Sequence, residues 1–237
     1  MDLLLKGSRE LGLTLSPDQV AQFRRYQREL LEWNRRVRLT ALVRDEDIQV
    51  KHFLDSLTVA PALPPEVRRG GWVMDVGSGG GFPGVPLKIL YPAIHLTLLD
   101  ATAKKTAFLE HLVSVLGLES VQVLTGRAEE LAHQPGLREA FDVVLARALA
   151  PLRVLAEVTI PFCRPGGIVV AQKKSAVQRE VAKASKALGV LGARLRETVP
   201  VEVASLRDGR VLVLLEKVQP TPPSYPRRPG IPRKRPL

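Results

Sequence analysis

The chain has 237 residues, of which 45% are hydrophobic and 25% are charged, a composition typical of one globular domain with a small extension. Its single cysteine excludes an internal disulfide and a cysteine-cluster metal site. The net charge of +11 indicates a polyanionic partner, although a solvated basic surface would give the same value. No apolar run is long enough to span a membrane and no signal peptide is evident, so we expect a cytoplasmic protein without a membrane partner.

The first 65 residues predict a helical cap. Ser16-Pro17-Asp18 is typical of a capped helix start, and apolar residues recur at helical spacing from Val20 to Leu31. The segment Trp33–Thr40 breaks this pattern. A second short helix is expected from Asp45 to Val59, and prolines 61, 64 and 65 close the cap.

Residues 66–218 alternate between short apolar strands and helices. Strands are expected at 72–76, 94–99, 121–124, 141–146, 167–172 and 211–216, with a further candidate at 199–203. Helices are expected at 104–116, 151–162 and 176–188. This alternation predicts a doubly wound α/β fold, in which a mostly parallel Rossmann-like sheet is covered by helices on both faces.

Residues 219–237 form a tail of different composition, with seven prolines, five lysines or arginines and no acidic residue. So many prolines are expected to exclude helix and central strand, which leaves an extended basic arm. A disordered terminus that only adds solubility is the alternative.

A glycine-rich loop, Gly77–Gly84, follows the first expected strand. Glycines let a ligand approach the backbone closely, and ligands of open α/β sheets bind at the carboxyl ends of the strands. The spacing Gly79-x-Gly81-x-x-Gly84 also matches the dinucleotide fingerprint, so an NAD(P)-dependent oxidoreductase is one alternative. Asp75 favours S-adenosylmethionine, because a carboxylate suits the cationic amino-acid end of that cofactor and not a pyrophosphate.

The next strands end in polar residues at the same edge of the sheet. Asp100 ends the second strand, where a carboxylate can bind ribose hydroxyls. Ala128 and Glu129 follow the third strand and could hold the flat face and the exocyclic amine of adenine. Arg147 ends the fourth strand. We expect it to face the cleft and bind cofactor or phosphate, and a surface ion pair with a neighbouring helix is the alternative.

The residues after the fourth strand constrain the methyl acceptor. They contain neither an Asn/Asp-Pro-Pro-Tyr-type motif nor a cysteine, which disfavours adenine amino groups and covalent attack on a pyrimidine. An acceptor that is already nucleophilic remains. Guanine N7 is one, because it loses no proton and needs no general base, so catalysis would be mostly positioning.

The sequence resembles the bacterial glucose-inhibited division protein B family, the small-subunit ribosomal RNA guanine-N7 methyltransferases. The resemblance spans nearly the whole chain and is carried by Trp33-Asn34 with Leu39-Thr40, His52–Leu57, Asp75–Leu87, Leu99-Asp100 with Lys104-Lys105, Gly126–Glu129, Ala146–Ala148 and Tyr225–Pro232. It implies the class I methyltransferase fold, S-adenosylmethionine as cofactor and S-adenosylhomocysteine as product. It also implies the substrate, a guanine in the 530 loop of 16S rRNA methylated at N7; a methyltransferase acting on another RNA is the alternative.

The resemblance and the strand positions together give the candidate site residues. Cofactor contacts are expected from Asp75, Gly77, Gly79, Phe82, Asp100, Ala101, Thr102, Ala128, Glu129 and Arg147. RNA contacts are expected from Arg35, Arg36, Arg38, Lys173, Tyr225, Arg227, Arg228, Arg233, Lys234 and Arg235. Candidates for the acceptor pocket are His52, Asp55, Ser56 and Arg147. The alternative for the first three, which share one helix face, is a hydrogen-bonding cluster between the cap and the sheet domain. No metal site is expected.

The expected partner is 16S rRNA, either free, in an assembly intermediate or in the small ribosomal subunit, and we expect a monomer. The charge of +11 disfavours a small-molecule methyltransferase. The retained pocket residues disfavour an RNA-binding factor without turnover. Removal of the tail is expected to weaken RNA binding and to leave the cofactor affinity unchanged.

Overall fold

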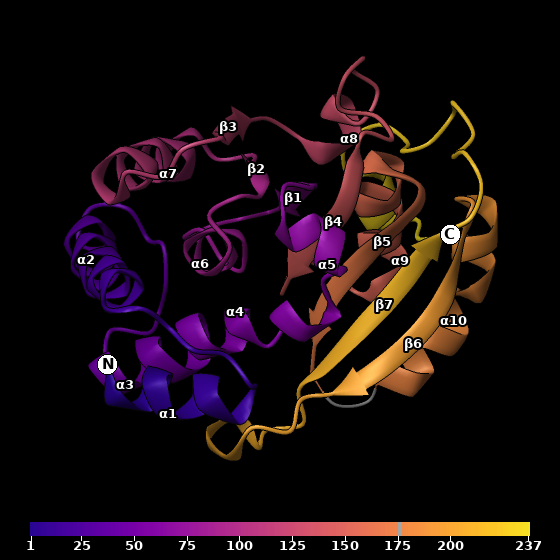
Figure 1. The fold of residues 1–237 in the computed structure, drawn as a ribbon. Coiled ribbons are helices and arrows are strands. Elements are labelled where there is room, and N and C mark those ends of the chain that lie inside the picture. The colour runs from indigo at the N-terminus through magenta and orange to yellow at the C-terminus, as the bar shows by residue number, and fades with distance from the viewer. Residues whose placement is uncertain (175–176) are drawn as a thin grey trace.

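The computed structural model describes residues 1–174 and 177–237 (Figure 1). Seven strands form one sheet in the order β3-β2-β1-β4-β5-β7-β6. The strands are β1 (Trp72–Val76), β2 (His95–Asp100), β3 (Val121–Thr125), β4 (Phe141–Arg147), β5 (Cys163–Lys173), β6 (Ala193–Pro200) and β7 (Val211–Lys217). Neighbours among β1–β5 are parallel, and β7 runs antiparallel to both β5 and β6. The predicted mostly parallel sheet is confirmed.

Most strand predictions agree with the structure to within one residue at each end, and the exceptions are β5 and β6. The expected strand at 167–172 begins four residues earlier, at Cys163. The candidate at 199–203 was wrong in its bounds, since β6 covers Ala193–Pro200. Most of β6 is exposed at the edge of the sheet, so it lacks the apolar alternation by which a half-buried strand is identified.

Helices surround the sheet. They are α1 (Asp2–Glu10), α2 (Pro17–Asn34), α3 (Asp45–Ile48), α4 (Asp55–Leu57), α5 (Pro65–Arg68), α6 (Gly84–Leu90), α7 (Ala103–Leu116), α8 (Ala128–Leu131), α9 (Leu152–Thr159), α10 (Val177–Val190) and α11 (Ile231–Lys234). Three short 3-10 helices are η2 (Ala60–Ala62), η3 (Ile160–Phe162) and η4 (Ala204–Leu206). Residue 176, where a helix was expected to begin, lies outside the described residues. None of the described helices is long and apolar enough to cross a membrane.

The cap contains the two expected helices. Ser16 caps α2, because its side chain accepts a hydrogen bond from the Gln19 N–H, and the Gln19 side chain bonds back to Ser16. The second expected helix runs through α3 and α4, but its centre is a π-helix, η1 (Gln49–Leu54). Such π-helical turns are rare and often occur at functional sites.

The sheet is covered on both faces (Figure 1). On one face, Phe23 of α2 and Phe53 of η1 belong to the same buried cluster as Val73 and Leu96 of the sheet. On the opposite face, α9 and α10 pack against a second cluster that contains Val144. The cap residues 1–65 therefore share one hydrophobic core with the sheet.

The tail does not form the expected extended arm. Residues 231–234 form helix α11, so the prediction that proline would exclude helix was wrong. Pro232 lies in the first turn of this helix, where its missing N–H would have no intrahelical partner anyway. The rest of the tail is docked on the domain, and the Arg138 guanidinium donates to the carbonyls of Thr221 and Tyr225, at 2.8 and 2.9 Å.

Candidate active site

The glycine loop leaves β1 and enters α6. Gly81 has a φ of +95°, and a Cβ at this position would lie 2.6 Å from the hydroxyl of Tyr26. A Cβ on Gly84 would lie 2.9 Å from Oδ2 of Asp75, the oxygen that accepts a hydrogen bond from the Gly84 N–H. These two glycines are therefore required by the packing of the loop itself.

Asp75 lies beneath this loop and is fully buried. Its Oδ2 accepts from the Gly84 N–H at 2.9 Å, whereas Oδ1 has no hydrogen-bond partner. Burial raises the pKa of the Asp75 carboxyl to about 7, and the Gly84 hydrogen bond acts in the opposite direction. Asp75 is therefore a carboxyl that an added positive charge near the loop would ionise.

A cavity of about 370 Å³ opens at the carboxyl ends of β1, β2 and β3. It is lined by Val76, Gly77, Leu99, Asp100, Ala101, Gly126, Arg127, Ala128, Glu129, Leu149, Ala150, Pro151, Val154, Val158 and Arg233. We call it the cofactor cavity, after the role that the sequence predicts for Gly77, Asp100 and Glu129. Apolar walls with a few carboxylates are typical of nucleoside-binding pockets, and the volume lies in the range of small-ligand sites.

Asp100 is held in place at the edge of this cavity. Its Oδ2 accepts from the Gly79 N–H at 3.0 Å and its Oδ1 accepts from the Thr102 N–H at 2.9 Å. Five of the expected cofactor residues thus line the cavity (Gly77, Asp100, Ala101, Ala128 and Glu129), while Gly79 and Thr102 position one of them.

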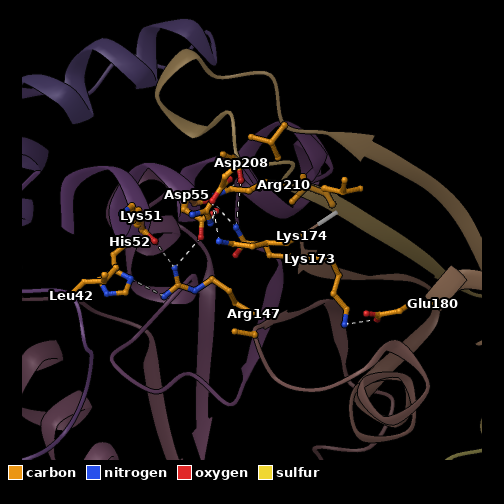
Figure 2. Close-up of a pocket in the computed structure, with 16 residues that line it drawn as sticks. Leu42, Lys51, His52, Asp55, Arg147, Lys173, Lys174, Glu180, Asp208 and Arg210 are labelled. Carbon is orange, nitrogen blue, oxygen red and sulfur yellow. Dashed lines mark hydrogen bonds and ion pairs between the residues drawn. The ribbon is translucent and has the colours of Figure 1, made fainter. Parts of the chain in front are cut away.

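A second cavity, of about 860 Å³, lies on the other side of the segment that follows β4. Figure 2 shows the residues that line it. It is lined by Leu42, Lys51, His52, Asp55, Thr58, Arg147, Ala148, Gln172, Lys173, Lys174, Glu180, Val201, Asp208, Arg210, Val211 and Leu212. We call it the acceptor cavity, after the role that the sequence predicts for His52, Asp55 and Arg147. It brings together the cap, the ends of β4 and β5, and the start of β7.

Arg147 extends from β4 toward the cap, between His52 and Asp55 (Figure 2). Its Nη1 lies 3.0 Å from Asp55 Oδ2 and its Nη2 lies 3.3 Å from His52 Nδ1. The guanidinium carbon is 4.8 Å from the centre of the Phe82 ring, within the range of a cation–π contact. Arg147 thus faces the second cavity and not the cofactor cavity, and its ion pair with the cap is largely buried and not at the surface. The expected binding of cofactor or phosphate stays a prediction.

Asp55 is shared between two arginines. Oδ1 lies 2.6 Å from Arg210 Nη1, and Arg210 Nε lies 2.9 Å from Asp208 Oδ1. Arg210 and Asp208 were not expected from the sequence. They immediately precede β7, the antiparallel strand, whose first residues lie at the edge where the parallel strands end. The strand was predicted at 211–216 but its antiparallel direction was not, and that direction is what places Asp208 and Arg210 at this edge.

His52 is a neutral imidazole with both nitrogens engaged. Its Nδ1 faces the Arg147 guanidinium, a donor, so the proton resides on Nε2, which donates to Thr40 Oγ1 at 2.7 Å. Burial, followed by the charge of Arg147, lowers the pKa of His52 to about 3. The ring stacks on Phe82 with centroids 4.4 Å apart.

Ser56, the third member of the expected group, is fully buried and lies outside the lining of the acceptor cavity. Its hydroxyl donates to the carbonyl of His52 at 2.7 Å. His52 and Asp55 line the cavity and also bond to Arg147, so the expected hydrogen-bonding cluster between cap and sheet and the expected pocket occur together.

The segment Arg147–Pro151 separates the two cavities. Arg147 and Ala148 line the acceptor cavity, whereas residues 149–151 line the cofactor cavity. Leu149 packs over the glycine loop, since its Cδ1 lies 2.7 Å from the position of a Cβ on Gly77. Ala148 has a φ of +52°, which is uncommon for a residue other than glycine.

The expected RNA-binding arginines of the cap lie in one exposed loop. The Asn34 amide closes this loop by accepting from the N–H groups of Leu39 and Thr40, at 2.8 and 3.0 Å, and by donating to the Thr40 carbonyl. Arg35, Arg36 and Arg38 are exposed in the loop. Because Thr40 also bonds to His52, the loop is connected to the acceptor cavity.

The remaining expected RNA contacts fall into two groups. Lys173 pairs with Glu180 at 2.7 Å, Arg227 pairs with the fully buried Glu157 at 2.6 Å, and Tyr225 is half-buried. These residues tie the structure together. The other group is exposed and consists of Arg228, Arg233, Lys234 and Arg235. Among the described residues, no three His, Cys, Asp or Glu side chains are grouped to hold a metal ion.

Comparison with known proteins gives matches over most of the chain. Residues 19–207 match the model of the GidB family, described as rRNA small subunit methyltransferase G. Proteins of that name from Dehalococcoides mccartyi and Roseiflexus castenholzii are each 46% identical over 237 residues, which is all of this chain and all of theirs. One from Moorella thermoacetica is 41% identical over 99% of this chain and 97% of its own.

Solved structures show the same fold at low sequence identity. A mutant of MtNAS in complex with S-adenosylmethionine superposes with a TM-score of 0.57 and 17% identity, over 92% of this chain and 77% of that one. A chain from the complex between the Haloferax volcanii Trm112 methyltransferase activator and a methyltransferase has a TM-score of 0.57 and 16% identity, over 81% of this chain and 98% of that one. The family match, the full-length relatives and the fold agree, and the chain belongs to the GidB family of rRNA small subunit methyltransferases.

Proposed function

We propose that this protein transfers the methyl group of S-adenosylmethionine to N7 of a guanine in the 530 loop of 16S rRNA, with S-adenosylhomocysteine as the second product. Membership of the GidB family supports methyl transfer to small-subunit rRNA over transfer of a hydride to a nicotinamide. The sequence resemblance implies that the methylated base is guanine and that the methylated atom is N7.

The residues of the cofactor cavity fit S-adenosylmethionine. Asp100, held by the N–H groups of Gly79 and Thr102, would bind the ribose hydroxyls, and Ala128 and Glu129 would hold the adenine. Asp75, beneath the loop, would attract the cationic amino-acid end. When bound, the cofactor supplies a methyl group on a positively charged sulfur.

The proposed acceptor rests on one observation, that the carboxylates around the acceptor cavity are all paired with cations. Asp55 is held by Arg147 and Arg210, Glu180 by Lys173, and Asp208 by Arg210 and Lys174. His52, the histidine of the lining, has both nitrogens engaged. Within the described lining, none of these groups is free to accept a proton. Such a cavity suits an acceptor that loses no proton.

Guanine N7 is such an acceptor. Its lone pair forms the new bond to the methyl carbon while the carbon–sulfur bond breaks, and the electron pair of that bond remains on sulfur. The positive charge thereby moves to the purine, so a free cation nearby would oppose the reaction. The pairing of Arg147 with Asp55 at 3.0 Å offsets its charge and leaves the protein mainly the task of positioning.

RNA binding would use the exposed arginines of the cap loop and the exposed cations of the tail, which are Arg35, Arg36, Arg38, Arg228, Arg233, Lys234 and Arg235. Cationic side chains bind RNA by displacing its counterions. The partner would be 16S rRNA, an assembly intermediate or the small subunit. We propose that the protein acts on it as a monomer in the bacterial cytoplasm.

The test is transfer of a tritiated methyl group from S-adenosylmethionine to small-subunit rRNA that lacks the modification, offered both as naked RNA and within 30S subunits. The labelled nucleotide is then mapped by mass spectrometry and by strand cleavage specific for N7-methylguanine. We expect label on a single 530-loop guanine. A label that maps to another base or another atom would contradict the proposed acceptor.

A matched inactive variant is Gly79→Asp. The new carboxylate would lie beside Asp100, to which the Gly79 N–H donates at 3.0 Å, and would repel the carboxylate that is expected to bind ribose. We expect this variant to lose cofactor binding by calorimetry and to transfer no label. Wild-type transfer by this variant would show that the glycine loop is not the cofactor site.

A further inference from the structure

The tail reaches the cofactor cavity, 75 residues further along the chain than Val158, the lining residue that precedes it. The Gly230 N–H donates to Glu129 Oε1 at 3.1 Å, and Arg233 is part of the lining. Helix α11 packs against α9, which supplies Val154 and Val158 to the same cavity. Among the described residues, the tail thus contributes Arg233 to the lining, next to the side chains of α9 against which α11 packs.

The docked position of the tail is specified by buried polar contacts. Glu157 is fully buried, and its two oxygens accept from Arg227 Nε and Nη2 at 2.7 and 2.6 Å and from the Arg227 backbone N–H at 3.0 Å. His133 Nε2 lies 2.8 Å from the Pro226 carbonyl. Since a buried carboxylate is costly without its partners, these contacts favour one position of the chain just before Gly230.

Gly230 itself has a conformational role. Its φ is +82°, and nothing lies within 4 Å of the place where a Cβ would be. The positive φ turns the chain at Gly230 into α11, and the Gly230 N–H bonds to Glu129 at this turn. Glu129 lies on α8, a helix of four residues, so this contact from the tail helps to fix the orientation of its carboxylate.

We propose that the tail completes the cofactor site, with Gly230 as the residue that positions Glu129, and that docking of the tail and binding of S-adenosylmethionine are coupled. This inference rests on the proposed function, which assigns the cavity to that cofactor. It replaces the expectation from sequence that removal of the tail would leave cofactor affinity unchanged.

Coupling of this kind is reciprocal. If the docked tail raises the affinity for cofactor, the cofactor must stabilise the docked tail by the same factor. The exposed side of the tail carries Arg228, Lys234 and Arg235, which are candidates for RNA contact. RNA that binds the docked tail would then also strengthen the retention of the cofactor.

The direct test is the affinity of the full-length variant Gly230→Pro for S-adenosylmethionine, measured by isothermal titration calorimetry. Proline removes the N–H that bonds to Glu129 and cannot adopt a φ of +82°. Because a hydrogen bond to a charged group is at stake, we expect the affinity to fall by about tenfold or more.

The matched control is Gly12→Pro. Gly12 has a φ of +70° with open space around it, and its N–H donates to the Arg9 carbonyl at 2.9 Å. Like Gly230→Pro, this substitution removes a backbone hydrogen bond and a turn with positive φ, but in the cap. We expect its affinity to stay within about twofold of wild type, because the loss is of a bond remote from the cavity. Equal affinity for wild type and folded Gly230→Pro would overturn the inference.

A second measurement on the unaltered protein does not depend on the folding of any variant. Hydrogen exchange of the amides in residues 227–235 is followed with and without S-adenosylmethionine. We expect slower exchange with cofactor, and unchanged exchange at saturating cofactor would contradict the coupling. If wild type binds no S-adenosylmethionine at all, the assignment of the cavity in the proposed function fails first, and the two failures are thereby distinguished.

Discussion

The Asp75 carboxyl makes cofactor binding dependent on pH. Its pKa is raised to about 7 by burial, so near neutral pH a large fraction of the free protein carries a proton there. A cationic ammonium group brought to the glycine loop favours the ionised form. Binding should therefore release a proton, and the affinity for S-adenosylmethionine should rise with pH by up to about tenfold per unit below pH 7.

Calorimetry between pH 5.5 and 7.5, in buffers of different ionisation enthalpy, measures this proton release. The upper limit keeps the ammonium of the cofactor charged, since α-amino groups titrate near about 8. Asp75→Asn is the control, because the amide keeps the shape and cannot titrate; whatever affinity it retains should be independent of pH. An affinity of wild type that is flat over this range would show that Asp75 does not respond to the ligand.

Site residues at the ends of parallel strands could be predicted from sequence, and those that depend on tertiary contacts could not. Asp100 ends β2 and Arg147 ends β4, two of the parallel strands, and each lines a cavity at this edge of the sheet. Arg210 precedes an antiparallel strand, and Glu157 is a buried acid within an apolar helix. Arg210 meets Asp55 and Glu157 meets Arg227, and these partners are distant in sequence, so local patterns carry no sign of the pairs.

At the scale of elements, Asp55 joins three of them. It lies on α4 in the cap and pairs with Arg147 at the end of β4 and with Arg210 before β7. The two arginine side chains are only 16% and 11% exposed, so water compensates their charges poorly. Asp55→Asn should therefore lower the free energy of unfolding by about 3–5 kcal/mol, the cost of leaving buried charges without a partner.

Urea unfolding followed by circular dichroism measures this change. Glu46→Gln is the matched control, because Glu46 pairs with Arg44 at 3.8 Å with both side chains more than 70% exposed. It should cost less than about 1 kcal/mol. If both substitutions have the same small effect, the cluster around Asp55 does not hold the cap to the sheet.

The elements that sequence patterns missed are those in which packing overrides local preference. The strand β6 is mostly exposed and rich in charged residues, so its strand conformation comes from pairing with β7 and not from apolar alternation. The tail has a proline content that disfavours helix, yet α11 forms where the tail docks against α9. The strands β1, β2 and β4 are mostly buried, and their apolar runs predicted them to within one residue at each end.

For the molecule as a whole, the sheet order determines where the cavities lie, and the net charge affects the encounter with RNA. The two hydrophobic clusters on either face of one sheet fix the cavities at the strand ends, and these determine the chemistry. The charge of +11 favours encounter with RNA, but the total does not say which residues contact the RNA. Its contribution must be located by removing charges in groups.

The salt dependence of RNA binding measures each group. For single-stranded RNA the slope of log K against log salt is about −0.7 for each phosphate contacted. Replacing the exposed tail residues Arg228, Lys234 and Arg235 with glutamine should therefore make the slope shallower by about 2. The cap triple Arg35, Arg36 and Arg38 should behave in the same way.

The control is a third triple on the exposed side of α10, Arg179, Lys183 and Lys186, for which we expect the slope to stay close to that of wild type. Filter binding to a 530-loop RNA between about 50 and 200 mM salt covers the range in which such contacts are lost. Equal slopes for all three triples would mean that the total charge, and not the tail and cap loop, draws the RNA to the protein.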